Sequence, residues 1–486
     1  MRPFLSMRLV VLCIAAVAAL ALAGTASAER YIVLYKEHGF GNWSAKSDIT
    51  RAGGSVVATY PQVDVVIAES SDPDFVKDMD RLRSVEGVAA VGSVVASASG
   101  FGFDGGSNRL DNEPVTDSDP LSPLQWYAKR IKAPEAHQVT GGAPEVTVGV
   151  IDTGVDATHP DIDGNIDASR SVSCVSGAPN QDPAAWNDDS GHGTNVAGII
   201  AAEANGQGIV GIAPRVKLAV IKAGVHSGAS DFFLADAVIC SLVWAADHGV
   251  DVANNSYSVD SALSGGTTTY CRADDAQRTV IKAVSRAVEY AQRRNVTMIA
   301  SAGNDGRDMS DPAFDRCSRL PSGLPGVLTV SSIGLMDGLA AGPPSNFGLG
   351  YVDLTAPGGD FMQGAPPAGL ILGPWPAAMQ VPRLVCDPCE GPGAAFYRYF
   401  AGTSQAAAQV SGVAALVVSK FGKDKWWKRG GGTMDPEDVS LILRQTADPL
   451  PCPADARCVS KKNENGFYGK GVVNALRAVT RDKRDR

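Results

Sequence analysis

The sequence has 486 residues, which at about 150 residues per domain is enough for two or three domains. Apolar residues make up 44% of the chain and charged residues 20%, and this balance excludes a disordered protein. The formal net charge is −9, and no cluster of lysine and arginine precedes the short charged tail at residues 481–486. Binding to nucleic acid needs a basic surface, so no nucleic-acid partner is expected.

The N-terminus has the pattern of a secretory signal. Arg2 and Arg8 precede an apolar run from Leu9 to Ala23, and the small residues 26–28 form a cleavage site. The apolar run is shorter than the ~20 residues that a membrane-spanning helix needs, and no later stretch is long and apolar enough. We therefore predict a signal peptide over residues 1–28, a secreted protein, and no membrane anchor after signal removal.

Export changes how the cysteines are interpreted. The chain has nine, and removal of Cys13 with the signal peptide leaves eight, an even number that predicts up to four disulfides. Cys452 and Cys458 enclose a short loop and are the simplest local pair. Cys386 and Cys389 lie in a Pro/Gly-rich loop, which favours a disulfide over a zinc or redox site. Cys240 lies in a predicted helix, where a buried free thiol is the alternative.

Residues 29–98 have the pattern of a small α+β unit. Alternating apolar residues predict strands over Tyr31–Lys36 and Val63–Ala68, a helix over Asp72–Val85 and another strand over Val88–Val95. Residues 99–120 follow, rich in Gly, Ser and Asp and without periodicity. This segment is expected to be a linker and a site of proteolytic cleavage.

Residues 121–480 have a different pattern, in which short apolar runs alternate with helical stretches. The predicted strands are Val146–Ile151, Lys217–Ile221, Val250–Asn254, Val296–Ala300 and Val327–Ile333. The predicted helices are Thr194–Ala204, Phe232–His248, Arg278–Arg294 and one running from about residue 401 to Lys420. Strands that alternate with helices predict an α/β domain with a mainly parallel sheet covered on both faces.

Four polar residues stand where active sites form in such sheets, at strand ends and helix starts. Asp152 ends a buried strand, His192 lies between two glycines before a helix, Asn304 follows a strand, and Ser404 opens a helix. Each has a structural alternative: a loop carboxylate, a loop histidine, a turn residue and a helix cap. Their occurrence together favours a catalytic site.

The order Asp152, His192, Ser404, with Asn304 between the last two, resembles the subtilisin family of serine peptidases. The motifs that carry the resemblance are Ile151–Gly154, Thr158–Asp161, Gly191–Thr194, Gly303–Asn304, Ala356–Gly358, Gly402–Ser404 and Gly469–Ala475. The resemblance implies a three-layer subtilisin-like fold for residues 121–480. By position and pattern, residues 29–98 also resemble the inhibitory, ferredoxin-like propeptide of these enzymes.

The resemblance implies a mechanism in which Ser404 attacks the peptide carbonyl and His192 takes its proton. Asp152 orients the imidazole and stabilises its charged form. The Asn304 side chain and the Ser404 backbone N–H would hold the oxyanion. No metal or other cofactor is required for this chemistry.

Substrate and calcium sites are also implied by the resemblance. The residues expected to bind the peptide and wall the pocket before the cut are Ser256, Tyr257, Ser258, Ser301, Ala302 and Gly303. These segments carry no charge, which favours apolar or aromatic substrate side chains; the alternative for Tyr257 is local packing. Asp161 and Asn205 match positions that bind a structural calcium in several relatives, and loop stabilisation without metal is the alternative.

The sequence departs from the family pattern at two motifs. Asn195 stands where the family has a histidine, and residues 405–409 read Gln-Ala-Ala-Ala-Gln where it has Met-Ala-(Ala/Ser)-Pro-His. None of these positions belongs to the triad. We therefore expect a secreted serine endopeptidase that acts on proteins or peptides.

The precursor is expected to be inactive, with its own propeptide as inhibitor, and to cut itself between about residues 95 and 120. The alternatives are a catalytically inactive binding module with this fold and a narrow-specificity maturation peptidase.

Overall fold

The computed structural model describes residues 28–37, 42–91, 114–228, 230–260, 269–362, 367–379, 381, 384–391, 393–424 and 432–481. Nearly all of the predicted signal peptide, the expected self-cleavage region up to residue 113 and the charged tail after residue 481 lie outside the described residues. No helix within these ranges is long and apolar enough to cross a membrane.

The first unit is a four-stranded antiparallel sheet with two helices. Its elements are β1 (Glu29–Tyr35), α2 (Asn42–Arg51), β2 (Gly54–Tyr60), β3 (Val65–Ser70), α3 (Phe75–Asp80) and β4 (Val85–Ala90), with strand order β2-β3-β1-β4. This βαββαβ order is ferredoxin-like, as expected. The predicted helix over 72–85 is shorter than expected, because the chain turns after Asp80 and β4 already begins at Val85. The sequence patterns did not identify α2 or β2.

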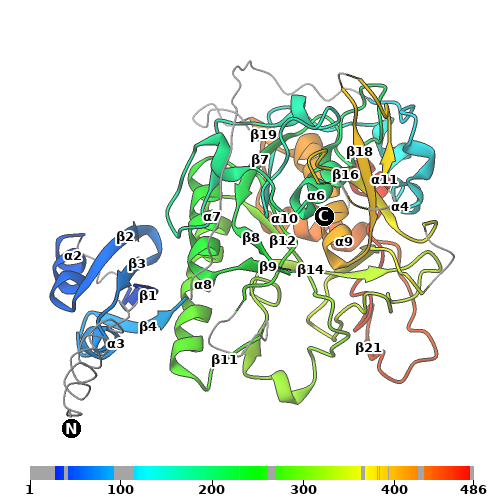
Figure 1. Ribbon diagram of the computed structural model, residues 1–486. Coiled ribbons are helices and arrows are strands. Elements are labelled where there is room, and N and C mark those ends of the chain that lie inside the picture. The colour runs from blue at the N-terminus through cyan, green and yellow to red at the C-terminus, as the bar shows by residue number, and fades with distance from the viewer. Residues whose placement is uncertain are drawn as a thin grey trace, which may run out of the picture.

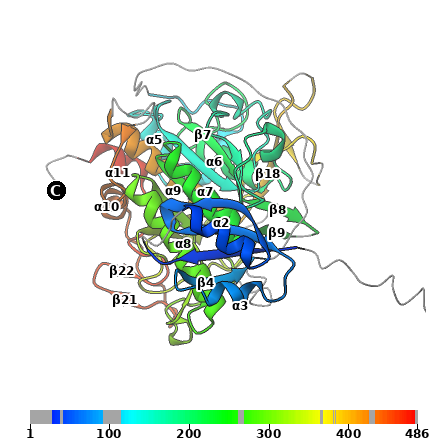
Figure 2. The same ribbon diagram turned by 90° about the vertical axis from the view of Figure 1, so that its left-hand side faces the viewer.

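Alternate residues of this sheet are buried on opposite faces. On β1, Tyr31, Val33 and Tyr35 pack in a core with α2 and α3, whereas Ile32 and Leu34 pack against α7 (Ala235–Asp247) and α8 (Asp275–Arg293). Figures 1 and 2 show this blue unit lying over α7 and α8. A two-residue repeat buried on both faces is what a strand between two layers requires.

The second unit contains a seven-stranded parallel sheet in the order β15-β14-β12-β10-β5-β7-β6. The strands are β5 (Thr147–Asp152), β6 (Val172–Ser173), β7 (Lys217–Lys222), β10 (Val252–Asn255), β12 (Thr297–Ser301), β14 (Val327–Ile333) and β15 (Leu354–Pro357). All five predicted strands are present within one or two residues of their expected ends. The short edge strands β6 and β15 were not predicted.

Helices cover both faces of this sheet. On one side lie α7 and α8; on the other lie α6 (His192–Ala201) and α9 (Thr403–Phe421), as Figure 1 shows. On β7, Leu218 and Val220 face the α6/α9 side, and Ala219 and Ile221 face the α7/α8 side. Within the described residues, this unit also contains the α-helices α4 (Trp126–Arg130), α5 (Ala133–His137), α10 (Pro436–Thr446) and α11 (Ala475–Thr480). The four predicted helices are confirmed.

A small antiparallel sheet lies against α6 and was not predicted. It is formed by β16 (Ile371–Trp375), β17 (Val385–Cys386) and β18 (Phe396–Phe400), in the order β16-β18-β17. Hairpins and two-residue ladders complete the unit: β8 (Gly224–Ser227) with β9 (Ser230–Phe233), β11 (Tyr270–Cys271) with β13 (Cys317–Ser318), β19 (Lys423–Asp424) with β20 (Gly432–Thr433), and β21 (Ser460–Lys461) with β22 (Glu464–Asn465). Gly198 of α6 lets Pro374 approach the helix closely. The β18 strand leads directly into the loop before α9.

Four disulfides join the eight cysteines that follow the signal region. The pairs are Cys174–Cys240, Cys271–Cys317, Cys386–Cys389 and Cys452–Cys458. The two short-range pairs agree with the sequence prediction. Cys386 and Cys389 form a disulfide, and neither a zinc site nor a free dithiol. The alternative of a free thiol at Cys240 is wrong, because α7 presents this side chain to Cys174 after β6.

Candidate active site

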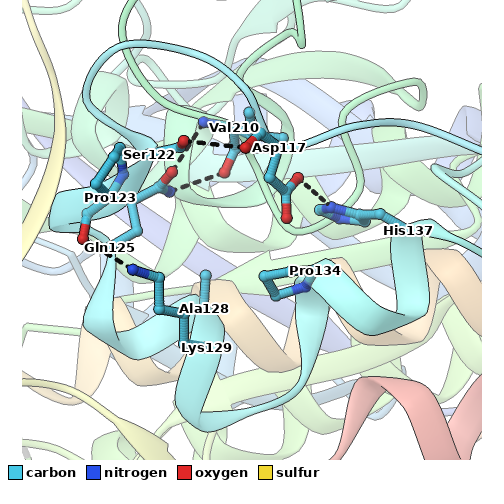
Figure 3. Close-up of a pocket in the computed structure, with 9 residues that line it drawn as sticks. All are labelled: Asp117, Ser122, Pro123, Gln125, Ala128, Lys129, Pro134, His137 and Val210. Atoms are coloured by element: carbon cyan, nitrogen blue, oxygen red, sulfur yellow. Dashed lines mark hydrogen bonds and ion pairs between the residues drawn. The ribbon is translucent and has the colours of Figure 1, made fainter.

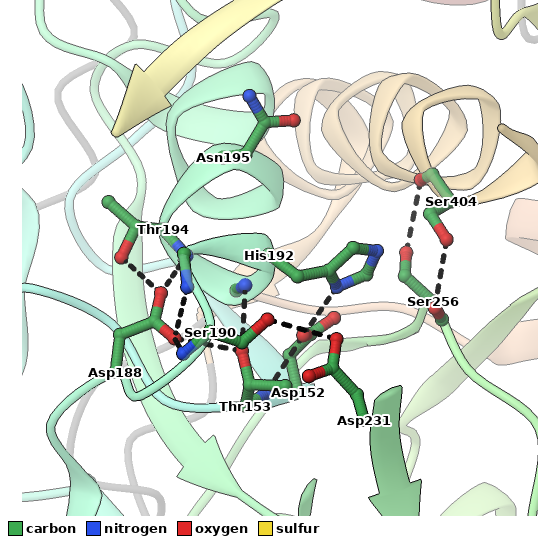
Figure 4. Close-up of polar contacts among 12 residues, drawn as sticks. Asp152, Thr153, Asp188, Ser190, His192, Thr194, Asn195, Asp231, Ser256 and Ser404 are labelled. Carbon is green, nitrogen blue, oxygen red and sulfur yellow. Dashed lines mark hydrogen bonds and ion pairs between the residues drawn. The ribbon is translucent and has the colours of Figure 1, made fainter. Parts of the chain in front are cut away.

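The fold brings Asp152 and His192 into direct contact. Asp152 is the last residue of β5, and His192 is the first residue of α6, which begins beside the end of that strand. Asp152 Oδ1 lies 2.7 Å from His192 Nδ1 and also accepts a 2.8 Å hydrogen bond from the Thr153 N–H (Figure 4). The carboxylate is completely buried, and the imidazole is 14% exposed. Nε2 of His192 is therefore the ring nitrogen that remains for a reacting group.

Gly191 and Asp188 fix the start of α6. Gly191 has φ 87°, and a Cβ there would lie 2.6 Å from the Trp375 ring, so only glycine fits. The buried Asp188 carboxylate accepts hydrogen bonds from the backbone N–H groups of Ser190, Gly191 and Thr194 and from the hydroxyls of Thr153 and Thr194. One carboxylate thus ties the loop before His192 to the residue after Asp152.

Ser404 lies at the second position of α9, after Gly402 and Thr403. It is 7% exposed, and its Oγ donates a 2.9 Å hydrogen bond to the Ser256 carbonyl, while the Ser256 Oγ donates to the Ser404 carbonyl at 3.0 Å. Figure 4 shows His192 between Asp152 and the start of α9. The hydroxyl is directed toward Ser256 in this structure, and a change of rotamer is needed for it to meet the imidazole. Such contacts are often made only once substrate is bound.

Asn304 follows β12 and faces the same helix start. Its Oδ1 accepts hydrogen bonds from the Thr403 N–H at 3.0 Å and the Thr403 hydroxyl at 3.1 Å. These bonds fix the side-chain amide with its oxygen toward Thr403, which leaves Nδ2 as the donor on the exposed side. An amide donor held next to free helix N–H groups is suited to stabilising negative charge.

Several carboxylates determine the charge of His192. Burial disfavours the imidazolium, but the adjacent Asp152, by its charge and hydrogen bond, together with the charges of Asp231 and Asp188, raises the pKa of His192 to about 9. Asp231 and Asp188 are contributors that the sequence analysis did not identify. Asp231 lies on β9, accepts a 2.9 Å hydrogen bond from the Ser190 hydroxyl and pairs with His226 at 2.8 Å.

This pKa predicts an alkaline pH profile. Because only the neutral imidazole can accept a proton, kcat/KM should rise with pH up to an inflection near pH 9. In Asp231→Asn, one negative charge that favours the imidazolium is lost, so the inflection should move to lower pH. The measurement is kcat/KM on a neutral peptide between pH 6 and 11, with the exposed Asp315→Asn as control. An inflection that is the same in Asp231→Asn and wild type would contradict this electrostatic role.

The expected substrate-binding residues lie beside this cluster. Ser256 bonds to Ser404, and the segments 256–258 and 301–303 follow the adjacent strands β10 and β12. The Tyr257 side chain is 5% exposed, stacks on Phe233 with ring centroids 4.4 Å apart and donates to Asn255 at 2.9 Å. The ring is therefore fixed by local packing.

A charge lies behind the expected pocket wall. Gly303 has φ 100°, and a Cβ there would lie 2.5 Å from the guanidinium carbon of Arg319. Arg319 is 7% exposed and pairs with Asp305 at 2.5 Å. The wall segments themselves carry no charge, so the preference for apolar or aromatic substrate side chains stays a prediction, with a paired arginine behind one wall. No local sequence signal marks this proximity, because Arg319 lies 16 positions after Gly303 and approaches it through the loop between β12 and β14.

The departures from the family motifs meet in space. Gln405 Nε2 donates to Asn195 Oδ1 at 3.1 Å, which links α9 to α6 one turn behind His192. Gln409 Nε2 donates to the carbonyls of Gln405 and Pro357. All three side chains are completely buried. The Gln405–Asn195 bond therefore links the two helices that carry Ser404 and His192.

Lys222 is another polar residue of the site that sequence reasoning missed. It ends β7, is 4% exposed and donates to the Thr153 carbonyl at 2.5 Å and the Asn187 carbonyl at 3.1 Å. It also pairs with Asp189 at 2.8 Å. The side chain braces the loops that follow Asp152 and precede His192.

The two expected calcium ligands lie on neighbouring loops. Asp161 Oδ2 accepts from the Ile209 N–H at 3.1 Å, and Asn205 Nδ2 donates to the Pro160 carbonyl at 3.0 Å. Burial, and then the charges of Asp119 and Glu203, raise the pKa of Asp161. A buried carboxylate near other carboxylates fits a cation. In the part of the chain that the structure describes, however, no three His, Cys, Asp or Glu side chains converge as metal ligands.

Figure 3 shows a separate hollow that shares no residue with the catalytic cluster. Its lining residues are Asp117, Ser122, Pro123, Gln125, Ala128, Lys129, Pro134, His137 and Val210. Both ring nitrogens of His137 are engaged, Nδ1 with Asp117 at 2.6 Å and Nε2 with the Ile212 carbonyl at 3.0 Å. This histidine is held as a structural residue and is not free to act on a ligand.

Comparison with known proteins identifies the family. The model of the subtilase family matches residues 143–471, more than half of the chain. The chain belongs to the subtilase family. A thermophilic serine proteinase from Bacillus sp. (strain AK1) is 31% identical over 414 residues, which cover 83% of this chain and 80% of that protein. The resemblance to the subtilisin family that the sequence motifs indicated is therefore confirmed.

Two further comparisons place this subtilase among its relatives. It is 28% identical to fervidolysin from Fervidobacterium pennivorans over 313 residues, 64% of this chain but only 40% of the length of fervidolysin. The crystal structure of the epidermin leader peptide processing serine protease from Staphylococcus aureus has a TM-score of 0.68. It is 20% identical and covers 94% of this chain and 98% of that one. At this identity the likeness shows the shared fold.

Proposed function

We propose that this subtilase is an exported serine endopeptidase that cleaves peptide bonds through an acyl-enzyme on Ser404. The observation that carries the proposal is the buried Asp152–His192 pair beside the N-terminus of the helix that presents Ser404. After rotation away from the Ser256 carbonyl, the hydroxyl gives its proton to His192 Nε2 and attacks the carbonyl carbon. His192 then gives the proton to the leaving amine, and water releases the acyl group by the same route.

The oxyanion would be held by two donors in this arrangement. The Asn304 Nδ2 group is directed outward because Thr403 occupies its oxygen. The Ser404 N–H belongs to the first turn of α9, where backbone donors have no partner within the helix. Both act together with the positive end of the α9 dipole.

Labelling with a fluorophosphonate probe tests this proposal. The processed protein should be labelled at Ser404, as mapped by mass spectrometry, and His192→Ala should lose the label because nothing accepts the hydroxyl proton. The control outside the triad is His248→Ala, whose imidazole stacks on Trp244 and bonds to its carbonyl. A folded, processed protein without label would mean that the triad does not assemble, and an inactive binding module would then be the better interpretation.

We also propose that residues 29–98 inhibit the enzyme before processing. The contact with the catalytic unit includes the Arg30–Asp236 ion pair at 3.0 Å, a 2.6 Å hydrogen bond from the Tyr60 hydroxyl to the Gly177 carbonyl and the Arg286–Glu86 pair at 2.6 Å. These polar contacts surround the apolar face of β1 and β3 on α7 and α8.

A nucleophile-free precursor tests self-processing. Ser404→Ala, purified after signal removal, should remain full length, whereas wild type is cut between about residues 95 and 120. The measurement is intact mass against time. The matched control is Ser411→Ala, which changes a buried serine of the same helix and should still be processed. Processing of purified Ser404→Ala at the wild-type rate would exclude self-cleavage and leave processing by another protease.

The breadth of the specificity is a separate question. The processed enzyme acts on protein or peptide substrates, and a narrow maturation peptidase is the alternative to a broad protease. One solved structure of similar fold is named for leader peptide processing. At 20% identity it shows the fold and does not distinguish narrow from broad specificity. Digestion of a peptide library distinguishes the two, since a narrow enzyme would cut only a small related set.

We propose a structural calcium at Asp161 and Asn205, consistent with the buried Asp161 carboxylate and its acidic neighbours. An ion there would offset their repulsion and stabilise the loop at residues 203–209. Treatment of Ser404→Ala with a chelator should lower its melting temperature, and added calcium should restore it. Asp161→Asn should remove most of this calcium response. An equal response in Asp161→Asn and its parent would place the ion elsewhere.

A further inference from the structure

A cationic side chain stacked on aromatic rings lies on the flank of His192. Arg398, at the middle of β18, has its guanidinium carbon 4.4 Å from the Trp375 ring centroid and 5.1 Å from that of Phe400. Phe400 in turn meets His192 edge to face, with centroids 6.2 Å apart, and Trp375 stacks on Phe400 at 6.1 Å. A ladder of one cation and two aromatic rings therefore begins at the catalytic imidazole.

Within the ranges that the structure describes, no carboxylate pairs with Arg398. Burial lowers the pKa of Arg398, and no neighbouring acidic group opposes this effect. Arginines in comparable surroundings elsewhere in the fold are paired. Arg457 also stacks on two rings, those of Phe347 and Phe467, but it binds Asp455 at 2.6 Å. A stacked, partly desolvated guanidinium that has no carboxylate partner in the described part of the chain is suited to receive an anion.

The position of the ladder indicates which part of a substrate would reach it. The segments after β10 and β12 lie on the Ser256 side of Ser404, and β18 lies on the His192 side. His192 gives its proton to the leaving amine, so the peptide beyond the cut extends along the His192 side. An extended peptide advances ~3.3 Å per residue. The Phe400 ring separates His192 from the Arg398 guanidinium. The side chain of the first or second residue after the cut would therefore reach this guanidinium.

We propose that Arg398 is a specificity-determining residue that binds an acidic side chain, Asp or Glu, at the first or second position after the cleaved bond. This inference rests on the proposed peptidase function of the same site and adds the chemistry of the leaving segment. Stacking on Trp375 and Phe400 holds the guanidinium in one orientation, which lowers the entropy lost on binding. The planar fork then donates to both oxygens of one carboxylate.

Matched peptides test the proposal. A peptide that the processed enzyme cuts is made with Glu or Gln at the first, and separately at the second, position after the cut. Wild type should show a kcat/KM about 10-fold higher for Glu than for Gln at one of these positions, as expected for one charge-assisted contact. The ratio should fall toward one in Arg398→Gln and be intermediate in Arg398→Lys, which keeps the charge without the fork. It should also fall at high salt.

The control is Arg457→Gln, which removes an arginine that also stacks on two rings but is paired with Asp455, and which should keep the wild-type ratio. A wild-type ratio of one at both positions, or an unchanged ratio in Arg398→Gln, would overturn the inference. The Gln peptides report peptidase activity separately from this preference. Cleavage of Gln peptides without a Glu preference rejects only the role of Arg398, whereas cleavage of neither peptide rejects the proposed function and this inference with it.

Discussion

Replacement of Asp152 by asparagine is expected to reduce kcat about 10⁴-fold, the loss that the same substitution causes in the triad of a chymotrypsin-type protease. Asp152 Oδ1 accepts from both His192 and Thr153, and Oδ2 is buried without a hydrogen-bond partner. If the new amide nitrogen faces His192, it donates to Nδ1 and forces the proton onto Nε2, which can no longer act as a base. If the amide oxygen faces His192, the tautomer is kept but the charge that stabilises the imidazolium is lost.

Peptide hydrolysis and probe labelling measure this effect. The control is Asp189→Asn in the loop before His192, where the carboxylate pairs with Lys222 and not with the imidazole. The control should keep its activity within about tenfold, as expected for a partly exposed ion pair. If Asp152→Asn lost no more activity than Asp189→Asn, the Asp152 carboxylate would not be needed to orient His192. The proposed triad would then be wrong.

The sheet could be predicted because its strands have local signals, and the triad residues because they stand in short motifs that resemble those of the subtilisin family. Buried parallel strands such as β5 and β14 are continuous apolar runs, and the glycines around His192 and Ser404 mark sharp turns into helices. By contrast, β18 has Arg398 between two pairs of aromatic residues, without apolar–polar alternation, and follows an irregular loop. Its strand partner β16 is more than 20 residues earlier, so the pairing has no short-range signal.

Residues that contact the catalytic residues from other helices and strands could not be identified from local sequence patterns. Asp231 and Lys222 act on residues 30 or more positions away, and nothing near them in the sequence marks them as neighbours of His192. Asn195 and Gln405 were visible as separate departures from a motif. Their hydrogen bond across 210 positions is a property of how α6 and α9 pack. Sequence patterns thus identify reacting groups better than the groups that hold them.

Asp188→Ala is expected to be the most destabilising single change near the site. The side chain is 5% exposed, and its two oxygens accept five hydrogen bonds, two of them from hydroxyls and three from backbone N–H groups. Alanine leaves these buried donors without an acceptor, and loss of one partner from a buried charged network typically costs about 3–5 kcal/mol. Asparagine is no substitute, because its NH₂ group would face donors.

The free energy of unfolding should be measured on the Ser404→Ala background, so that self-digestion does not enter. Asp182→Ala is the matched control, since that aspartate caps a short helix through a single bond to the Ala184 N–H and should cost only about 0.5–2 kcal/mol. In the active background, Asp188→Ala should also lower kcat, because the start of α6 and Thr153 lose their common anchor. Equal stabilities of Asp188→Ala and Asp182→Ala would mean that water replaces the carboxylate, and the loop before His192 would then be held chiefly by Lys222 and the packing of Trp375 on Gly191.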